Sequence, residues 1–253
     1  MNLAGRHALV TGGGRGIGAA IACALTGAGA VVTVLGRNLA TLEAAVSRGD
    51  AAGLAVADVT DRDAIMAAVA RAQAIHGALD ILVNNAGAAE SAPFAKLARP
   101  SWDRMISVNL TAVFETTQVV LPGMVARGWG RVVNIASTAG LKGYGYVAAY
   151  VAAKHGVIGL TRALAVETAK TGVTVNAVCP GYTETTLLDE AVAEVVRKSG
   201  RKAEDVRASF ARGNPQGRLV APEEVAAAVL FLCGPNSAAM TGQSIAIACG
   251  EVM

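Results

Sequence analysis

Short apolar runs recur along the 253-residue chain, and the intervals between them are long enough to hold a helix. The runs are rich in Val, Leu and Ile and do not alternate strictly with polar residues, which is typical of strands buried on both faces of a parallel sheet. Seven such strands are expected, at residues 7–11, 31–35, 54–59, 79–85, 130–137, 173–180 and 244–248.

The segments between these runs carry apolar residues three and four positions apart, as amphipathic helices do. The pattern predicts helices over residues 61–75, 101–126 and 222–233, and the last begins with Pro222 before two glutamates, a favourable helix start. A parallel crossover needs a connection of helix length. The expected fold class is therefore α/β: a doubly wound Rossmann fold with a parallel sheet of about seven strands and helices on both faces.

The composition narrows the class of protein. With 53% hydrophobic and 16% charged residues the chain can bury a large core, and no linker divides it, so a single domain over residues 1–253 is expected. No apolar run reaches the roughly 18 residues of a membrane span. Four scattered cysteines and an N-terminus without a signal-like apolar core favour the cytoplasm.

The distribution of charge excludes nucleic acid as the expected partner, and the histidine and cysteine content excludes a metal ion as the expected ligand. The net charge of +3 is spread along the chain and lacks the clustered basic footprint of nucleic-acid-binding proteins. The three histidines stand alone and no Cys-x-x-Cys pair occurs, so no metal site is expected.

A glycine-rich loop follows the first strand, with the sequence Thr-Gly-Gly-Gly-Arg-Gly-Ile-Gly over residues 11–18. Glycines in a strand-to-helix turn let the backbone approach a pyrophosphate at the helix N-terminus, where free N–H groups favour anions. Such loops can also be simple turns, but the strand, loop, helix and strand context favours dinucleotide binding. The spacing is G-x-x-x-G-x-G rather than the general G-x-G-x-x-G.

The end of the second strand indicates which dinucleotide is bound. An acidic residue there binds the ribose 2′-hydroxyl of NAD, whereas an arginine accommodates the 2′-phosphate of NADP. This chain has Arg37 and no carboxylate, and Arg15 lies inside the loop, so NADP(H) is favoured over NAD(H). Two solvated arginines are the simpler alternative.

Further motifs follow in a fixed order. The fourth strand is followed by Asn-Asn-Ala-Gly at 84–87, Asn109 lies within Ser-Val-Asn-Leu, Ser137 ends the fifth strand, Tyr150-x-x-x-Lys154 follows, and Pro-Gly at 180–181 ends the sixth. This set resembles the short-chain dehydrogenase/reductase family, especially its 3-oxoacyl thioester reductases, over nearly the whole chain. The resemblance implies a homotetramer and the catalytic set Asn109, Ser137, Tyr150 and Lys154.

The chemistry of this set also follows from its residues. Reducing a ketone requires a proton for the developing alkoxide, and a tyrosine is a suitable weak acid if a cation lowers its pKa of about 10. Lys154 lies one helical turn from Tyr150 and is expected to lower that pKa. Tyr144 and Tyr146 have no lysine four residues later. Ser137 would hold the substrate oxygen, unless it is simply a polar strand end.

Asn109 lies in a helical pattern, where asparagine is unfavourable because its side chain competes for backbone hydrogen bonds. The resemblance implies a helix distortion at this residue and a water-mediated proton path to Lys154; plain tolerance is the alternative. Asp58 would contact the adenine, or else cap the helix that begins near Asp61. Thr183 stands where the family usually has an aliphatic residue, which puts its nicotinamide contact in doubt.

The resemblance gives the full cofactor-binding set. It comprises Gly12, Arg15, Gly16, Ile17, Gly18, Arg37, Asp58, Val59, Asn85, Ala86, Gly87, Tyr150, Lys154, Pro180, Gly181, Thr183 and Thr185.

A substrate lid is expected over residues 184–216, the longest stretch without a strand signal. The expected pocket residues are Tyr144, Tyr146, Tyr182, Leu187 and Leu188. Basic residues in the second half of the lid would suit a phosphate-bearing carrier such as coenzyme A or acyl carrier protein, although a solvated helix face is the commoner explanation.

The expected function is an NADP(H)-dependent oxidoreductase that interconverts a ketone and a secondary alcohol, with a 3-oxoacyl thioester or small carbonyl substrate. An NAD-dependent alcohol or hydroxyacyl dehydrogenase of the same family is the alternative. A non-catalytic dinucleotide sensor would not need the four catalytic residues together, and an epimerase or dehydratase would favour a different glycine loop.

Overall fold

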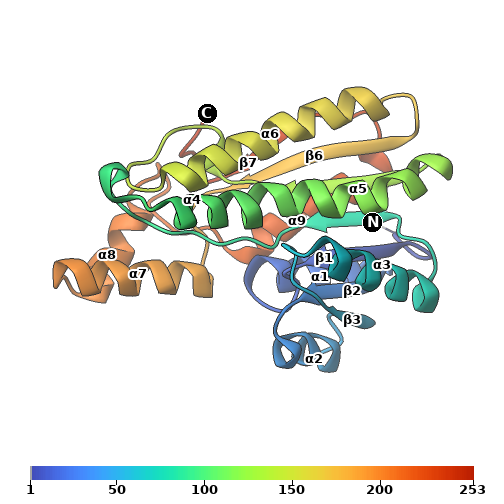
Figure 1. Cartoon of the computed structure of the whole chain (residues 1–253), viewed down its shortest axis with the longest axis horizontal. Helices are drawn as coiled ribbons and strands as arrows, with labels where there is room; N and C mark the ends of the chain where they lie inside the picture. The colour runs from blue at the N-terminus through green and yellow to red at the C-terminus, as the bar shows by residue number, and fades with distance from the viewer. Residues whose placement is uncertain (1) are drawn as a thin grey trace.

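The computed structural model describes residues 2–253, which fold around one seven-stranded parallel sheet (Figure 1). The strand order is β3-β2-β1-β4-β5-β6-β7. The strands are β1 (His7–Thr11), β2 (Val31–Gly36), β3 (Gly53–Val56), β4 (Ile81–Asn84), β5 (Gly130–Ile135), β6 (Val173–Pro180) and β7 (Ser244–Ile247).

Nine α-helices are found within residues 2–253. They are α1 (Gly16–Gly27), α2 (Leu39–Ser47), α3 (Arg62–His76), α4 (Arg99–Ile106), α5 (Ala112–Ala126), α6 (Ala148–Thr168), α7 (Thr186–Ser199), α8 (Ala203–Ala211) and α9 (Pro222–Cys233). The expected α/β class and doubly wound sheet are thereby confirmed.

Each strand contributes side chains to two separate cores because successive residues point to opposite faces of a sheet. In β1, Ala8 and Val10 pack with α1, α2 and α9, whereas Leu9 packs on the other face with α3 and α5. This two-sided burial is why the strands read as continuous apolar runs in the sequence.

Three features refine the sequence-based expectation of the elements. The helix expected over residues 101–126 contains a π-helical turn, Ser107–Thr111, between α4 and α5, at the place where a distortion was expected. The third strand ends at Val56, so residues 57–59 lie beyond it. The lid contains two helices, α7 and α8, where the sequence suggested only amphipathic stretches.

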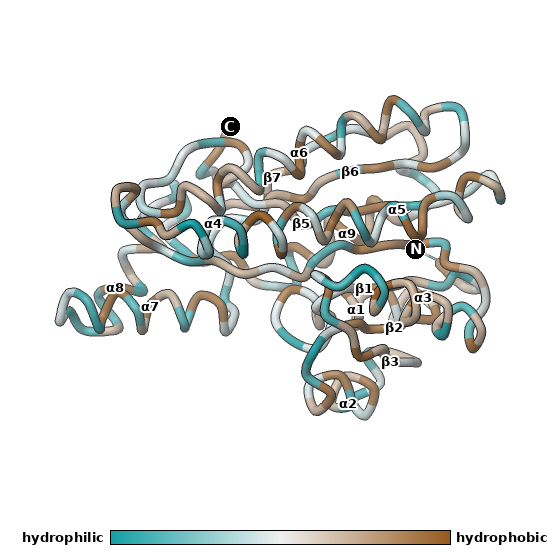
Figure 2. The backbone as a smooth tube through the Cα atoms, viewed as in Figure 1, coloured by the Kyte–Doolittle hydropathy of each residue, from teal (hydrophilic) through white to brown (hydrophobic). Residues whose placement is uncertain are grey.

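The strand order places the functional segments together. The chain reverses direction across the sheet between β3 and β4, so a crevice opens at the carboxyl ends of β1 and β4, where open α/β sheets bind ligands. Helices α7 and α8 extend from one end of the molecule (Figure 1). In Figure 2 their tubes alternate between hydrophilic and hydrophobic colours, as expected for a helix pair packed on one side only.

Candidate active site

The glycine loop forms a cradle that side chains would fill. A Cβ on Gly18 would lie 2.2 Å from the Gly12 carbonyl oxygen, and a Cβ on Gly13 would lie 2.5 Å from Val34. Gly12 has φ +65°, in the left-handed region that favours glycine. Helix α1 begins directly after this loop, and Arg15 at its N-cap makes no side-chain capping bond. The backbone therefore leaves N–H groups and space for a pyrophosphate, which fits a dinucleotide.

Asn85 fastens this cradle to the end of β4. Its side-chain amide donates hydrogen bonds to the carbonyl oxygens of Thr11 (2.9 Å) and Gly12 (3.2 Å). In return the Thr11 hydroxyl accepts the N–H groups of Asn85 and Ala86. Two segments more than seventy residues apart in sequence thus form one rigid floor for the crevice.

The first turn of the lid lies against the glycine loop. Thr185, the N-cap of α7, lies 3.2 Å from the position that a Cβ on Gly16 would occupy. Arg15 pairs with Glu190 at 3.6 Å, and both side chains are largely exposed. Thr183 is buried, and its hydroxyl donates to the Gly181 carbonyl oxygen. Residues expected to contact opposite ends of a dinucleotide therefore share one opening.

Arg37 lies at the carboxyl end of β2 with a side chain that is 79% exposed. Its guanidinium is 3.6 Å from the carboxylate of Asp58. Asp58 also accepts the backbone N–H and hydroxyl of Thr60, whereas Asp61 caps α3. The alternative role of Asp58 as the cap of that helix is therefore wrong. Its carboxylate and Arg37 border the same part of the crevice.

Tyr150 and Lys154 lie one turn apart on α6, as their spacing predicts. Lys154 Nζ is 5.6 Å from the centroid of the Tyr150 ring and donates a 2.8 Å hydrogen bond to the Ile135 carbonyl oxygen. Lys154 is only 4% exposed, whereas Tyr150 is half-buried. The ammonium thus faces the phenol without bonding to its hydroxyl.

The expected effect of Lys154 on the pKa of Tyr150 is wrong. Desolvation raises the pKa of Tyr150 above its usual value, and a hydrogen bond with Ser137 opposes this rise only in part. Burial also lowers the pKa of Lys154 to about 8. Desolvation therefore dominates both groups, because it penalises the phenolate and the ammonium alike.

Ser137 lies two residues beyond the end of β5. Its side chain accepts the N–H of Ala139 and caps a short 3₁₀ turn, Thr138–Gly140, and its hydroxyl acts to lower the pKa of Tyr150. The strand end and the following turn thus aim this hydroxyl at the phenol.

Asn109 lies inside the π-helical turn, fully buried, so the helix distortion expected at this residue is present. Its side-chain amide donates to the carbonyl oxygens of Ala88 (2.9 Å) and Met105 (3.0 Å), and its oxygen accepts the N–H of Ala88. A Cβ on Gly87 would lie 2.8 Å from this oxygen and 3.9 Å from Lys154 Nζ. Asn109 therefore holds the loop after β4 beside the lysine.

These groups together form an acid, a hydrogen-bonding serine and a cation next to a dinucleotide cradle. The family model for short chain dehydrogenases matches residues 6–195. The chain belongs to the short-chain dehydrogenase family.

The relatives of this short-chain dehydrogenase are named as reductases of ketones or dehydrogenases of hydroxyl groups. An acetoacetyl-CoA reductase of Rhizobium meliloti is 43% identical over 97% of this chain and 98% of its own length. A D-beta-hydroxybutyrate dehydrogenase of Cupriavidus necator is 41% identical over 91% of both chains. Among solved structures, a variant of actinorhodin polyketide ketoreductase with NADPH is 40% identical, with a TM-score of 0.94 over 97% of both chains. An oxidoreductase acting on hydroxyl or ketone groups is thereby confirmed.

The tyrosines of this dehydrogenase occupy different environments. The rings of Tyr144 and Tyr182 meet edge to face at 6.4 Å, and Tyr182 stacks on Phe210 of α8 at 4.5 Å. Tyr146 is 70% exposed and has φ +68°, which is unusual for a residue with a side chain. Tyr144 and Tyr182 thus lie together between the catalytic helix and the lid.

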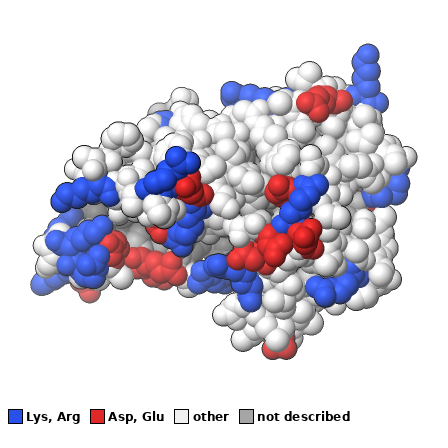
Figure 3. Space-filling model, viewed as in Figure 1, with Lys and Arg blue, Asp and Glu red and all other residues white. Residues whose placement is uncertain are grey.

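The lid has a small core of its own. Leu188 is buried there with Val192 of α7 and Val206 of α8, whereas Leu187 is 39% exposed. Figure 3 shows basic side chains gathered over the end of the molecule where α7 and α8 lie, with acidic ones between them. Arg197 and Lys198 both pair with Glu194. Much of the lid's basic charge is therefore neutralised locally.

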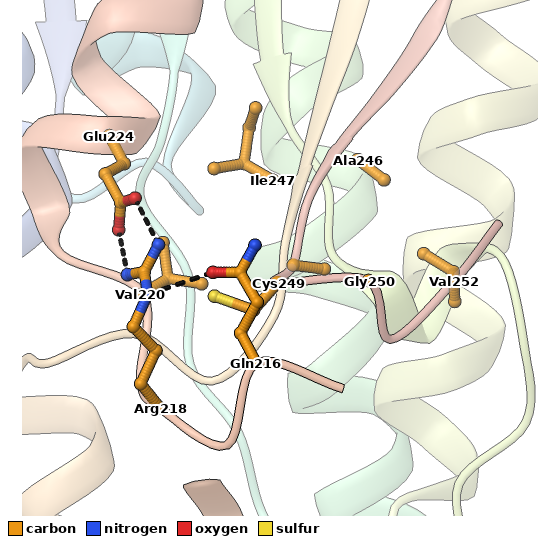
Figure 4. A pocket seen from close by; sticks show the side chains of 10 residues that line it. Gln216, Arg218, Val220, Glu224, Ala246, Ile247, Cys249, Gly250 and Val252 are labelled. Atoms are coloured by element: carbon orange, nitrogen blue, oxygen red, sulfur yellow. Dashed lines mark hydrogen bonds and ion pairs between the residues drawn. The ribbon is translucent and has the colours of Figure 1, made fainter. Parts of the chain in front are cut away.

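A hollow of about 290 Å³ lies beside the segment 246–252 rather than over the glycine loop. Figure 4 shows Arg218 bonded to Glu224 in its lining, with Gln216 on the other side of the guanidinium. Within residues 2–253, no group of three or more His, Cys, Asp or Glu side chains is arranged to hold a metal ion. In the same part of the chain, no helix has the length and apolarity to cross a membrane.

Sequence reasoning missed one group of residues near the site. Lys142, Tyr144 and Glu251 form a hydrogen-bonded cluster, although Glu251 follows Tyr144 by 107 residues. No local pattern marks such a pair, because the contact depends on how segment 248–253 returns across β6 and β7.

Proposed function

We propose that this chain is an NADP(H)-dependent ketoreductase that interconverts a 3-oxoacyl thioester and the corresponding 3-hydroxyacyl thioester, with Tyr150 as the acid and base. The observation that carries the proposal is the placement of Tyr150, whose ring is faced by Lys154 Nζ at 5.6 Å and whose pKa is acted on by the neighbouring Ser137 hydroxyl at the end of β5. A dinucleotide bound in that cradle supplies the hydride.

The protonation state of Tyr150 suits reduction. Because burial raises its pKa, the phenol keeps its proton at neutral pH and can donate it to the oxygen of the substrate as negative charge develops there. Ser137 provides a second hydroxyl for that oxygen. Lys154, held by the Ile135 carbonyl oxygen, supplies positive charge beside the phenol when Tyr150 gives up its proton.

Asn109 completes the proton path in this proposal. Its side-chain amide donates to the carbonyl oxygens of Ala88 and Met105 at the π-helical turn. This turn lies next to Gly87 and Lys154. A water bound at this opening would connect Lys154 with solvent, and the lysine would then return a proton to Tyr150.

The choice of NADP(H) is supported by Arg37, which is exposed at the end of β2 and free to turn from Asp58 toward a 2′-phosphate. The related actinorhodin polyketide ketoreductase was solved with NADPH. Asp58 would then contact the adenine. The remaining cofactor residues would border the same crevice. The Thr183 hydroxyl donates a hydrogen bond to the Gly181 carbonyl oxygen of its own loop.

The thioester substrate is supported by the names of the relatives, which include acetoacetyl-CoA and ketoacyl reductases. The substrate side would be formed by Tyr144, Tyr146, Tyr182, Leu187 and Leu188. A second candidate is oxidation of a free 3-hydroxy acid, because one relative is a D-beta-hydroxybutyrate dehydrogenase at 41% identity.

A cytoplasmic homotetramer is part of the proposal. Exposed apolar side chains on α5, α6 and α9, namely Phe114 (42%), Val166 (80%) and Phe231 (43%), support association through these helices. The four cysteines are all free, which fits a reducing compartment.

A substrate panel tests the function. Acetoacetyl thioesters, acetoacetate, simple ketones and their alcohols are assayed with NADPH and with NADH, and the Tyr150→Phe variant serves as the blank. We expect turnover with the thioester and NADPH that this variant lacks. Tight NADPH binding without turnover of any carbonyl compound would instead favour a dinucleotide sensor.

A further inference from the structure

Glu251 carries a nearly buried carboxylate on the substrate side of the site. Its side chain is 5% exposed. Its Oε1 accepts a 2.6 Å hydrogen bond from the Tyr144 hydroxyl and lies 3.2 Å from Lys142 Nζ. A buried charge is costly unless it is paired and hydrogen-bonded, and these two partners meet both requirements.

This carboxylate lies next to the loop that follows β6. Glu251 Oε2 is 3.0 Å from the position that a Cβ on Gly181 would occupy. The negative charge of Glu251 also contributes to raising the pKa of the neighbouring Tyr182, and Tyr182 in turn acts on Tyr150. Through Tyr144, whose ring meets that of Tyr182 at 6.4 Å, Glu251 is linked to the wall of the site.

The same cluster fixes the segment between two catalytic residues. The Tyr144 hydroxyl shares a 2.6 Å hydrogen bond with Thr138, which directly follows Ser137. Lys142 Nζ lies 5.0 Å from the centroid of the Tyr144 ring. The connection from Ser137 to α6 is therefore held at its middle by Glu251.

Segment 248–253 has two sides. Cys249, Gly250 and Val252 line the hollow shown in Figure 4, whereas Glu251 is not among its lining residues and bonds to Tyr144 instead. The carboxylate therefore lies on the side that contacts the connection between Ser137 and α6.

We propose that Glu251 is a positioning and specificity-determining residue of the substrate site. Through the Tyr144 hydroxyl it fixes the wall beside Tyr182, and by neutralising Lys142 it keeps this side of the site from attracting substrates that carry a free carboxylate in addition to the 3-oxo group. The neutral thioester is thereby selected over the free 3-oxo acid. This inference rests on the ketoreductase function proposed above.

The charge effect works through Lys142. Replacing Glu251 by glutamine leaves the Lys142 ammonium without its counter-charge and changes the local charge by one unit. At an effective dielectric constant of about 20, one unit charge about 10 Å from an anionic group changes its binding by a factor of about ten. Glutamine keeps an oxygen that can accept the Tyr144 hydroxyl, so the wall itself is retained.

The test compares two substrates with the same 3-oxo group, the neutral acetoacetyl N-acetylcysteamine thioester and anionic acetoacetate, both with NADPH. For Glu251→Gln we expect the ratio of kcat/KM for thioester over acetoacetate to fall about tenfold, mainly through a lower KM for acetoacetate. Glu167→Gln, which removes an exposed carboxylate of α6, is the matched control and should leave the ratio unchanged. An unchanged ratio in Glu251→Gln would overturn the charge role.

A double-mutant cycle tests the positioning role. Tyr144→Phe and Glu251→Ala should each raise KM for the thioester with little change in kcat, and the double variant should resemble either single one, because both remove the same contact. Additive effects on KM would refute action through Tyr144. A merely structural role would lower the melting temperature in Glu251→Gln and leave the substrate ratio unchanged.

Failure of the proposed function can be distinguished from failure of the role inferred for Glu251. If the wild-type protein reduced neither substrate, that function would be wrong, and calorimetric titration of acetoacetate into the NADPH complex would then decide the role of Glu251. Tighter binding by about tenfold in Glu251→Gln would support the inference, and equal binding would overturn it.

Discussion

Lys154 Nζ lies 5.6 Å from the centroid of the Tyr150 ring while it donates a hydrogen bond to the Ile135 carbonyl oxygen. The lysine is therefore anchored to β5, and its distance from the phenol is set by the sheet rather than by a direct bond. An anchored cation can stabilise a phenolate when one forms without competing for the proton that the phenol must donate.

The raised pKa of Tyr150 predicts opposite pH dependences for the two directions of the reaction. Reduction needs the protonated phenol, which burial maintains at neutral pH, so kcat/KM for the ketone should stay level there. Oxidation needs the phenolate, so kcat/KM for the alcohol should rise with pH toward the alkaline range. Initial rates measured in both directions over about pH 6–10 check this. An oxidation rate that falls as pH increases would contradict it.

Replacing Lys154 by methionine should stabilise the fold while abolishing turnover. Because the pKa of Lys154 falls from 10.5 to about 8, the unfolded chain binds more protons between these values, and stability of the wild type rises with pH across that window. Lys154→Met removes the burial cost, so the free energy of unfolding at pH 7 should increase by about 1–2 kcal/mol after the lost Ile135 bond is offset.

This gain should shrink as pH rises from about 8 to 10.5, because the wild-type lysine is then neutral in the folded state and giving up its proton on folding costs less as pH rises. Urea unfolding at neutral and alkaline pH measures both values. A Lys154→Met protein that is less stable at pH 7 would show that the lysine is net stabilising.

Tyr146 and Tyr150 should separate recognition from chemistry. Tyr146→Phe should retain appreciable turnover and change selectivity among ketones, because this exposed ring lies outside the catalytic group. Tyr150→Phe should lower kcat by about 10²–10⁴-fold and leave NADPH binding nearly unchanged, since only the acid is removed. Steady-state rates and NADPH fluorescence titration distinguish the two. Equal loss of hydride transfer in both variants would refute this division of roles.

Arg37→Ala should reduce the preference for NADPH. A charge-assisted hydrogen bond to phosphate contributes enough for KM of NADPH to rise by about 10–100-fold, while KM of NADH should change little. Arg71→Ala, at an exposed position of α3, is the matched loss of one positive charge. If both cofactors weakened equally in Arg37→Ala, the residue would not recognise the 2′-phosphate.

Two glycines of α1, Gly18 and Gly27, provide a matched pair of variants that tests the glycine cradle. Gly18→Ala places a methyl group against the Gly12 carbonyl oxygen, at 2.2 Å, and should weaken NADPH binding by more than about tenfold and lower stability. Gly27→Ala meets nothing within 4 Å and should be neutral or stabilise by up to about 1 kcal/mol. NADPH titration and thermal unfolding report on both. Normal NADPH affinity in Gly18→Ala would show that the loop can move aside.

The positions of the strands could be anticipated because the physical signal is local. Buried strands such as β1 and β6 leave continuous apolar runs, and in Figure 2 the tube of β6 is hydrophobic over most of its length. Tyr150 and Lys154 could be paired because four residues is one helical turn. These inferences need only the period of a helix or a strand.

The remaining features depend on contacts between distant segments. The pairing of Tyr144 with Glu251 and of Arg15 with Glu190 arises from chain crossings that no short pattern encodes. Sequence spacing also gave the wrong direction for the pKa of Tyr150, because the distance to a cation can be estimated from spacing but the loss of water around the phenol cannot.

Tyr146 shows where two demands on this protein conflict. Its left-handed backbone conformation favours glycine, and a residue with a Cβ in this conformation lowers the free energy of unfolding by about 1–2 kcal/mol. Because the ring is exposed, it buries little apolar surface and offsets little of this cost. Selection for heat resistance alone would replace Tyr146 early, so thermostabilised descendants of this enzyme are expected to lose substrate discrimination at this position before they lose catalysis.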